Sequence, residues 1–564
     1  MSDLKELLKA SGPNLYLGTK LQILRLLYYV FYKLEMFPKS EMIVEAISQK
    51  KDPMCRILSK LLIINDVNDN LLKEWSLLLE KLSDDDFKEL LAFLNHYNST
   101  ESATEELEAL STFILGKSDA VLDYCSGEGS FLSFYGNKYP KSRLFGIEIH
   151  EEAYLTSVIN LDLQGFDHQI YHEDAIQNNT LFKEANEFDR IYSNFPINLM
   201  QKNLRETHHS LNHLTKYNFN ALPERDNNWL FVTHVVNLLS AQGKAVVVAP
   251  LMMLYRESQK PIRDEYLEKG LVEAIIQLPE RTLNYVSIPM ALLILSPNNK
   301  EVRLVDATDA YTKGRRTNHL DNDLIIKRLE GDSEYAITLS NEILIQEYDS
   351  WLPRNILLHS QLDYDGTQLD DLTEDLFRGA QINRRDLESM KKEPENQDEC
   401  VTYQIVSLSS FDDGIHLDQL ETIYPPQASY DRYLIQNHDI LMTARGTLFK
   451  IGLVEIDQDA RLIATGNVTV IRLDPARMNP LYVFLFLKSP KGQRLLESIQ
   501  KGSKIFIINN KDLAKLKIPV IPRGKQDALV DKYLALKDQK RLHQKRLKRL
   551  DEDIHRLYDI VGDI

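Results

Sequence analysis

The sequence has few cysteines and no long uninterrupted apolar run. Its three cysteines, Cys55, Cys125 and Cys400, are odd in number and far apart, so they form neither a disulfide framework nor a zinc set. The N-terminal stretch MSDLKELLKASG has no apolar core of the kind that a signal peptide needs. The nearby stretch LQILRLLYYVFYKL contains Arg25 and Lys33 and is too short to cross a bilayer. We therefore expect a cytoplasmic protein without a metal centre.

The chain has fewer basic than acidic residues overall, but one part of it is rich in basic residues. The 67 Lys and Arg residues against 83 Asp and Glu give a net charge of −16, which argues against non-specific coating of nucleic acid. Residues 485–549, however, contain 18 Lys and Arg against 5 Asp and Glu. Two interpretations stay open: a surface that faces a polyanion, or a basic helix face that pairs with the acidic remainder.

The 564 residues are too many for one core, and the pattern changes along the chain. Residues 1–115 show apolar positions at three-and-four spacing, which predicts a helical domain. Within 116–320, seven short apolar runs alternate with helical stretches, as in a doubly wound, Rossmann-like α/β sheet buried on both faces. We expect a helical link at 321–366 and an α+β domain of strands and turns at 367–522.

The most regular pattern lies in residues 523–564. Ten positions follow one another at alternating spacings of four and three, which is a heptad seam that needs a partner helix. They are Leu529, Tyr533, Leu536, Lys540, His543, Leu547, Leu550, Ile554, Leu557 and Val561. Either two copies of the chain pair as a coiled coil through 525–561, or the helix packs against its own α/β domain.

The α/β domain contains the pattern of a nucleotide-like cofactor site. In VLDYCSGEGSFL a strand ends in Asp123, and Gly127 and Gly129 let the backbone approach a ligand, although a plain tight turn carries the same glycines. The next strand ends in Glu148, an acidic residue at the position that holds ribose hydroxyls. The third strand ends in Asp174, which is placed to accept an adenine amine.

The spacing of the glycines distinguishes between two cofactors. The dinucleotide pattern GxGxxG is missing, because Ser130 and Phe131 fill the stretch where the third glycine would fall. This favours S-adenosylmethionine over NAD. The fourth strand, in FDRIYSNFPIN, ends beside Asn194.

These motifs, in order, resemble the modification subunit of type I restriction–modification systems. The resemblance covers about residues 1–350 and includes DYCSGEGSF, LFGIEIHEEAYLTSVINLDLQG, EDA and FDRIYSNFPIN. It implies a DNA adenine-N6 methyltransferase that uses S-adenosylmethionine and acts on a flipped adenine. It also implies that the cofactor is bound by Asp123, Gly127, Gly129, Phe131, Glu148 and Asp174.

The resemblance places the catalytic tetrad at Asn194, Phe195, Pro196 and Ile197, where the usual order is Asn or Asp, Pro, Pro, aromatic. Asn194 keeps the amide acceptor, but Ile197 removes a stacking face worth about 1–3 kcal/mol per base. The Phe195 ring is one candidate to replace it. The alternatives are a slow or inactive homologue that acts as a DNA-binding component, and a protein-glutamine methyltransferase.

Residues 367–564 resemble half of a type I specificity subunit, with one target-recognition domain and one spacer helix. The segments that carry this resemblance include DILMTARGTLFKIGLV and the run from KGS through LKIPVIP. It implies double-stranded DNA as a partner, and a homodimer would then read a bipartite, palindromic site. Because the chain has no GxxxxGK[ST] motif, cleavage would need a separate restriction subunit. The candidates for DNA contact are Arg378, Arg445, Lys450, Lys501 and Lys504.

Overall fold

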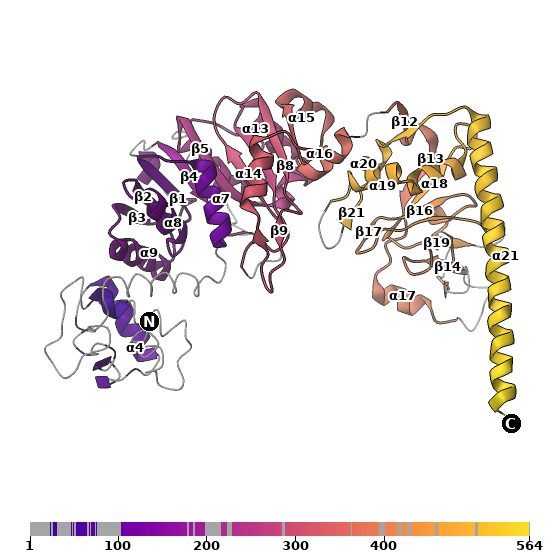
Figure 1. The fold of residues 1–564 in the computed structure, drawn as a ribbon, viewed down its shortest axis with the longest axis horizontal. Coiled ribbons are helices and arrows are strands. Elements are labelled where there is room, and N and C mark those ends of the chain that lie inside the picture. Colours follow the sequence, from indigo (N-terminus) through magenta and orange to yellow (C-terminus); the bar gives the residue numbers. More distant parts are fainter. Residues whose placement is uncertain are drawn as a thin grey trace. The chain divides into compact units, whose positions relative to one another are not determined.

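The computed structural model of the chain divides into two compact units, residues 1–354 and 355–564 (Figure 1). Before residue 103 it describes only 23, 26–30, 45, 47, 49, 52–64, 67, 69–70, 72–73 and 75. From residue 103 it describes the chain to 562, except for 178–179, 184–186, 198–215, 223–227, 285–287, 362–363, 394–400, 413, 417–419, 426–429, 457–460 and 502–505.

A nine-stranded sheet forms the centre of the first unit, in the order β11-β8-β6-β7-β5-β4-β1-β2-β3. Strands β3, β2, β1, β4 and β5 are parallel neighbours, whereas β7 runs antiparallel to β5 and β6. The strands are β1 (Ala120–Tyr124), β2 (Arg143–Glu148), β3 (His168–His172), β4 (Phe188–Ser193), β5 (Leu239–Pro250), β6 (Val272–Gln277), β7 (Met290–Leu295), β8 (Glu301–Asp306) and β11 (Ala336–Ser340). A separate two-stranded pair is formed by β9 (Tyr311–Thr312) and β10 (His319–Leu320).

The seven strands expected from the sequence are β1 to β7, and they are confirmed. The central strands are buried on both faces, with every residue of β7 buried, whereas the edge strand β3 has no fully buried residue. The sheet also contains β8 and β11, which the sequence did not reveal. Both lie toward one edge, where β8 alternates charged and apolar residues, and β11 falls inside the segment 321–366 that was expected to be a helical link.

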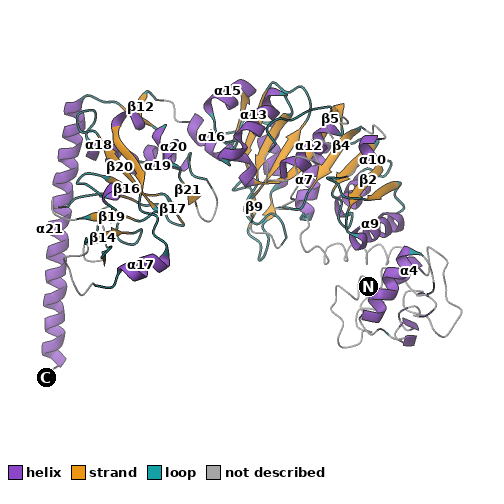
Figure 2. Ribbon diagram, turned by 180° about the vertical axis from the view of Figure 1, so that it is seen from behind, coloured by secondary structure: helices purple, strands orange, loops and turns teal. Residues whose placement is uncertain are grey.

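Helices cover both faces of this sheet (Figure 2). On one face, side chains of α7, α8 and α14 join a single apolar cluster with alternate residues of the central strands. The helices of the unit are α4 (Pro53–Ile64), α7 (Glu105–Leu115), α8 (Ser130–Lys138), α9 (Glu151–Gln164), α10 (Thr180–Lys183), α12 (Asn228–Asn237), α13 (Lys260–Glu268), α14 (Asn322–Glu330), α15 (Asn341–Glu347), α16 (Pro353–Ser360), and the 3-10 turns η3 (Leu251–Leu254) and η4 (Glu257–Gln259). Helix α16 continues into the second unit.

Much of the predicted helical domain, 1–115, lies outside the described residues. The described part includes α4, whose apolar face packs in one cluster with Leu155 and Ile159 of α9. Helix α7 belongs instead to the sheet, because Leu107, Leu110 and Leu115 are buried in the cluster that covers β1 and β5. No helix in the described part of the chain is long and apolar enough to cross a membrane.

The second unit combines short sheets with helices. A four-stranded sheet has the order β13-β20-β16-β18 and a three-stranded sheet the order β15-β14-β19, with the pairs β12-β22 and β17-β21 beside them. The strands are β12 (Gly366–Gln368), β13 (Thr373–Arg378), β14 (Tyr403–Val406), β15 (Glu421–Ile423), β16 (Ile440–Thr443), β17 (Arg445–Gly446), β18 (Ile451–Leu453), β19 (Leu462–Ala464), β20 (Val468–Leu473), β21 (Phe506–Ile507) and β22 (Lys517–Pro519). The helices are η5 (Asp370–Leu372), α17 (Arg384–Met390), η8 (Asp431–Tyr433), α18 (Pro480–Lys488), α19 (Pro490–Glu497), α20 (Asn510–Ala514) and α21 (Arg523–Gly562).

Helix α21 is 40 residues long, and Figure 1 shows it in yellow along one side of the second unit. Its first turns pack on that unit, because Val530 is buried in the apolar cluster of α18 and Tyr533 lies against the ring of Phe484. Six of the expected seam residues are exposed, and five of them lie beyond Tyr533. They are Leu529, Leu536, Leu547, Leu550, Ile554 and Leu557, with exposed fractions of 49, 56, 61, 50, 44 and 61%.

Candidate active site

The carboxyl ends of four parallel strands bring the expected site residues to one edge of the sheet. In the register, Asp123 at the end of β1 lies opposite Tyr192 of β4, two residues before Asn194. On its other side β1 pairs with β2, which ends in Glu148, and Glu148 pairs with His172 of β3 just ahead of Asp174. This edge is where open α/β sheets bind ligands.

The loop after β1 has an unusual backbone. Cys125, Gly127 and Gly129 have φ values of 96°, 53° and 78°, a region that side chains with a Cβ rarely adopt. A Cβ on Gly129 would lie 2.9 Å from the Cβ of Ser157, so this glycine is needed for packing against α9. A Cβ on Gly127 would meet nothing within 4 Å. The open side of the loop is therefore at Gly127, where a ligand can reach the backbone.

Two of the expected cofactor carboxylates are held by backbone amides. Glu148, 8% exposed, accepts hydrogen bonds from the N–H groups of Gly127 at 2.9 Å and His150 at 2.7 Å. Asp174 accepts from the N–H of Ile176 at 2.9 Å. A carboxylate has about four acceptor positions. Both groups therefore keep capacity for ribose hydroxyls and an adenine amine.

A third carboxylate, Asp123, is buried with an unsatisfied oxygen. It is 2% exposed, and no described group forms a hydrogen bond with its Oδ1. Burial, followed by the charges of Glu108 and Glu148, raises its pKa well above the usual value. The hydroxyl of Tyr192, buried beside it, also finds no described hydrogen-bond partner. Such orphaned polar atoms below an open glycine loop fit a site for the amino-acid end of a polar, cationic cofactor.

Phe131 differs from the other expected cofactor residues. Its ring is 2% exposed and stacks on Tyr192, with centroids 3.9 Å apart and an interplanar angle of 15°. The side chain therefore supports the strand that leads to Asn194 from within the core.

Glu108 of α7 is a residue that the sequence analysis missed. It is 7% exposed and accepts a hydrogen bond from the Ser130 hydroxyl at the start of α8. Burial raises its pKa to about 7, although the Ser130 hydrogen bond opposes the rise. No signal in EELEAL separates this buried acid from its neighbours, because its burial depends on the sheet behind it.

We expect Glu108→Gln to raise the free energy of unfolding above that of the wild type, and by more at pH 8 than at pH 5. The folded-state pKa of about 7 lies above the ordinary value of 4.5, so stability falls as pH rises between these values and the full penalty applies above pH 7. A pKa shift of this size corresponds to about 3 kcal/mol of folding free energy. Urea unfolding at both pH values measures the difference, with the neighbouring Glu105→Gln as control. Equal gains at pH 5 and pH 8 would contradict the assignment.

The tetrad segment leaves Asn194 free and turns Phe195 inward. Asn194 is half-buried, and no described residue forms a hydrogen bond with its side chain. Ser193 holds the end of β4 in place, because its hydroxyl donates to the Tyr124 carbonyl at 2.6 Å. The Phe195 ring is 1% exposed and stacks on Phe231 of α12, with centroids 5.0 Å apart and planes 1° from parallel. It therefore does not occupy the place that Ile197 leaves without an aromatic ring.

Pro196 is exposed and Ile197 is half-buried, packed against the apolar cluster of the sheet. A buried hydrogen-bond network lies at the end of β1. The Tyr124 hydroxyl donates to the carbonyl of Ala175 and lies 2.8 Å from Nδ1 of His234 on α12. It connects the end of β1 with the loop that carries Asp174.

Two family models match the chain. The model described as N-6 DNA Methylase covers residues 105–336, and the model described as Type I restriction modification DNA specificity domain covers residues 381–552. The chain joins a DNA methylase domain to a type I specificity domain. Both parts of the resemblance inferred from the sequence are confirmed by these matches.

The methylase domain is homologous to type I methylase subunits. The MpnII methylase subunit of Mycoplasma pneumoniae is 24% identical over 234 residues, which are 38% of this chain and 43% of that protein. The MjaVII methylase subunit of Methanocaldococcus jannaschii is 30% identical over 203 residues, 33% of this chain and 34% of that protein. The chain thus spans less than half the length of these curated relatives.

Among solved structures, the type I methyltransferase subunit from Streptococcus thermophilus is 18% identical, with a TM-score of 0.49. The similarity covers 62% of this chain and 97% of that one.

In the specificity domain, the expected DNA contacts fall into two classes. Lys450 pairs with Asp412 at 2.8 Å and donates to the carbonyls of Leu408 and Phe411, and Lys501 is buried and paired with Asp512 at 2.6 Å. The charge of each of these lysines is therefore paired with a carboxylate of the same domain. By contrast, no described carboxylate pairs with Arg378 or Arg445. Lys504 lies outside the described residues.

Proposed function

We propose that the protein is a site-specific DNA adenine-N6 methyltransferase of a restriction–modification or related phage-defence system. The observation that carries this proposal is the open amide of Asn194 at the carboxyl end of β4, beside the glycine loop and Asp123. The match to the N-6 DNA methylase model, which implies S-adenosylmethionine as cofactor, supports the same conclusion. The specificity domain supports double-stranded DNA as the substrate.

In this proposal each group in the site has one task. S-adenosylmethionine, when bound, supplies an electrophilic methyl group. Asp123 and the open backbone at Gly127 would hold its amino-acid end, while Glu148 and Asp174 would accept hydrogen bonds from its ribose and adenine. The Asn194 amide oxygen and the carbonyl of Phe195 accept hydrogen bonds from the amine of a flipped adenine, which orients its lone pair for in-line attack.

The tetrad also supports a second candidate, a DNA-binding homologue with slow or no turnover. With Phe195 packed on Phe231, no ring of the tetrad is available to stack on the flipped base. The loss of about 1–3 kcal/mol corresponds to roughly one to two factors of ten in rate.

The purified chain with labelled S-adenosylmethionine separates the two candidates. We expect label on adenine in a randomised library of duplex DNA. A chain that binds the cofactor but labels no DNA would favour the DNA-binding homologue, and label on protein glutamine would contradict both.

We expect Ile197→Tyr to raise turnover by about tenfold, because it restores a ring that can stack on the flipped base. The measurement is single-turnover methyl transfer on a DNA site selected by the wild-type chain. Ile197→Val is the matched control, since it alters the same position without adding a ring. If both variants behave alike, another ring already performs the stacking.

We further propose that two copies pair through residues 525–561 of α21. The exposed apolar stripe of this helix supports the pairing, and two specificity domains related by two-fold symmetry would read a bipartite, palindromic site. A separate restriction subunit would supply any cleavage.

A further inference from the structure

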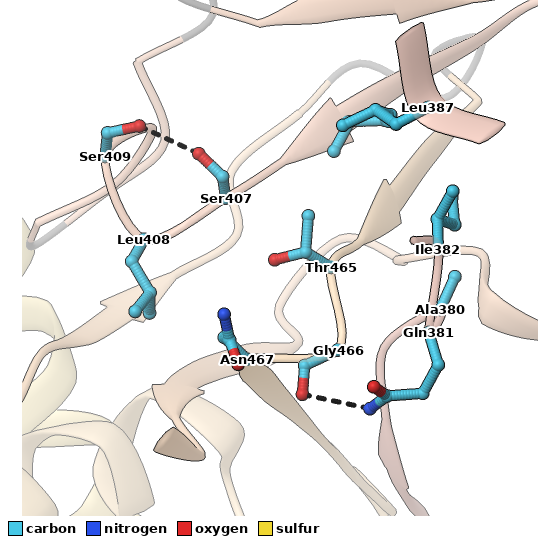
Figure 3. A pocket seen from close by; sticks show the side chains of 11 residues that line it. Ala380, Gln381, Ile382, Leu387, Ser407, Leu408, Ser409, Thr465, Gly466 and Asn467 are labelled. Atoms are coloured by element: carbon cyan, nitrogen blue, oxygen red, sulfur yellow. Dashed lines mark hydrogen bonds between the residues drawn. The ribbon is translucent and has the colours of Figure 1, made fainter. Parts of the chain in front are cut away.

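The specificity domain contains a pocket, lined by both polar and apolar groups, that none of the expected site residues lines. Its volume is about 490 Å³, within the range of small-molecule and base-sized sites. The residues that line it come from three segments, as Figure 3 shows. The polar residues among them are Gln381, Ser407, Ser409, Thr465 and Asn467.

Backbone hydrogen bonds hold the three segments together. The parallel strands β14 and β19 end side by side at the pocket, and the N–H of Thr465 donates to the carbonyl of Val406 at 3.0 Å. The N–H of Ala380 donates to the carbonyl of Ala464 at 2.8 Å. The Nζ of Lys450 donates a hydrogen bond to the carbonyl of Leu408 at 3.0 Å. These hydrogen bonds fix the three segments relative to one another, and such preorganisation lowers the entropy that binding would cost.

Amide and hydroxyl groups give the pocket its chemistry. Gln381 is exposed, and its Nε2 donates to the carbonyl of Gly466 at 3.2 Å. Figure 3 shows the Thr465 hydroxyl and the Asn467 amide directed toward the side where Ser407 and Leu408 lie. No described group forms a hydrogen bond with the side chains of Thr465 or Asn467. Asn and Gln amides are the groups that bind adenine edges in two places at once.

Two arginines contact residues that line the pocket. Arg378 Nε donates to the carbonyl of Gly466 at 2.5 Å, and the N–H of Arg445 donates to the carbonyl of Asn467 at 3.3 Å. Burial, followed by the charge of Arg445, lowers the pKa of Arg378. The two positive charges are thus close enough to repel each other, and the described residues place no carboxylate between them. A polyanion would relieve this repulsion.

We propose that Gln381 and Asn467, both exposed where they line this pocket, reach into a groove of double-stranded DNA and read the edge of a base pair, while Arg378 and Arg445 bind the flanking phosphates. The inference rests on the proposed function in taking DNA as the substrate, and it assigns which residues supply affinity and which supply sequence preference. Phosphate contacts add affinity for every sequence, whereas contacts to a base edge favour one.

Fluorescence anisotropy with the full-length chain tests the assignment. The probes are a duplex that the wild-type chain retains from a randomised library and a scrambled duplex of the same composition. We expect Arg378→Gln and Arg445→Gln to weaken binding to both duplexes and to reduce the salt slope by about one each. We expect Gln381→Ala and Asn467→Ala to weaken only the selected duplex, by about 5–150-fold, and to relax one position of the selected sequence.

Arg432→Gln, an exposed arginine in η8 that lies outside both the pocket lining and the basic segment 485–549, is the matched control and should bind as the wild type does. Circular dichroism and thermal unfolding exclude variants that fail to fold. Wild-type binding by both arginine variants, or no sequence preference in the wild-type chain, would overturn the proposal. Because no methyl transfer enters this measurement, a chain that does not methylate still tests the pocket. Normal binding by all pocket variants would leave the proposed activity intact.

Discussion

Asn194→Ala is expected to lower methyl transfer by at least 100-fold while leaving cofactor and DNA binding unchanged. The adenine amine is a poor nucleophile because its lone pair is delocalised into the ring, and the Asn194 amide is the side-chain acceptor at the end of β4 that would localise it. Removing one aligned hydrogen-bonding group from an active site typically lowers the rate by about 10²–10³-fold. Single-turnover transfer of labelled methyl groups to the selected duplex measures the loss.

Two further variants show whether the loss comes from the acceptor. Asn194→Asp keeps an oxygen acceptor in the same place and should retain more activity than Asn194→Ala. Asn137→Ala removes an exposed amide on α8 and is the matched control. If Asn194→Ala kept more than half of the wild-type rate, the proposed chemistry at this position would be wrong, even if the DNA were methylated.

Removal of the exposed part of α21 is expected to convert a dimer into a monomer. The cut must respect the packing of the first turns. Gln526 is 3% exposed and its Oε1 accepts from the N–H of Asn479, Val530 is buried, and Lys537 pairs with Glu455. A chain that ends at residue 538 keeps these contacts and removes seven of the ten seam positions. Light scattering should give twice 65.3 kDa for the full chain and a single mass for the shortened one.

Point variants show whether dimerisation depends on the seam residues or on other exposed residues of the helix. Leu547→Glu together with Leu550→Glu places charges on the seam in both copies. Burial of a leucine contributes about 1.5–3 kcal/mol, so we expect the dimer dissociation constant to rise by at least 100-fold. Leu542→Glu is the control, because Leu542 is 64% exposed but lies off the seam. If the double variant Leu547→Glu/Leu550→Glu keeps the same mass as the control, pairing through α21 is excluded.

Local sequence patterns were enough to predict much of the methylase domain. Short apolar or β-branched runs predicted β1 to β7. The central strands carry the clearest runs, because a strand buried on both faces needs apolar residues almost throughout, whereas the edge strand β3 has no buried residue. The order of Asp123, Gly127, Glu148 and Asn194 predicted one site, since parallel strands bring their carboxyl ends to one edge. Strand β8 was missed because an alternating strand near the edge carries charges that resemble a loop.

The tertiary structure decided the packing, burial and ion pairing of individual side chains. Asn194 was readable from its motif, but the direction of the Phe195 ring depends on Phe231, which belongs to a different helix. Glu108 becomes a buried acid only through the sheet behind α7. Lys450 and Arg445 are both cations in one short segment, yet among the described residues a carboxylate pairs with Lys450 and none with Arg445. The sequence by itself determined the order of the strands and motifs, because these depend on local composition. Which charges and rings remain free for a ligand was decided by neighbours that folding brings from distant parts of the chain.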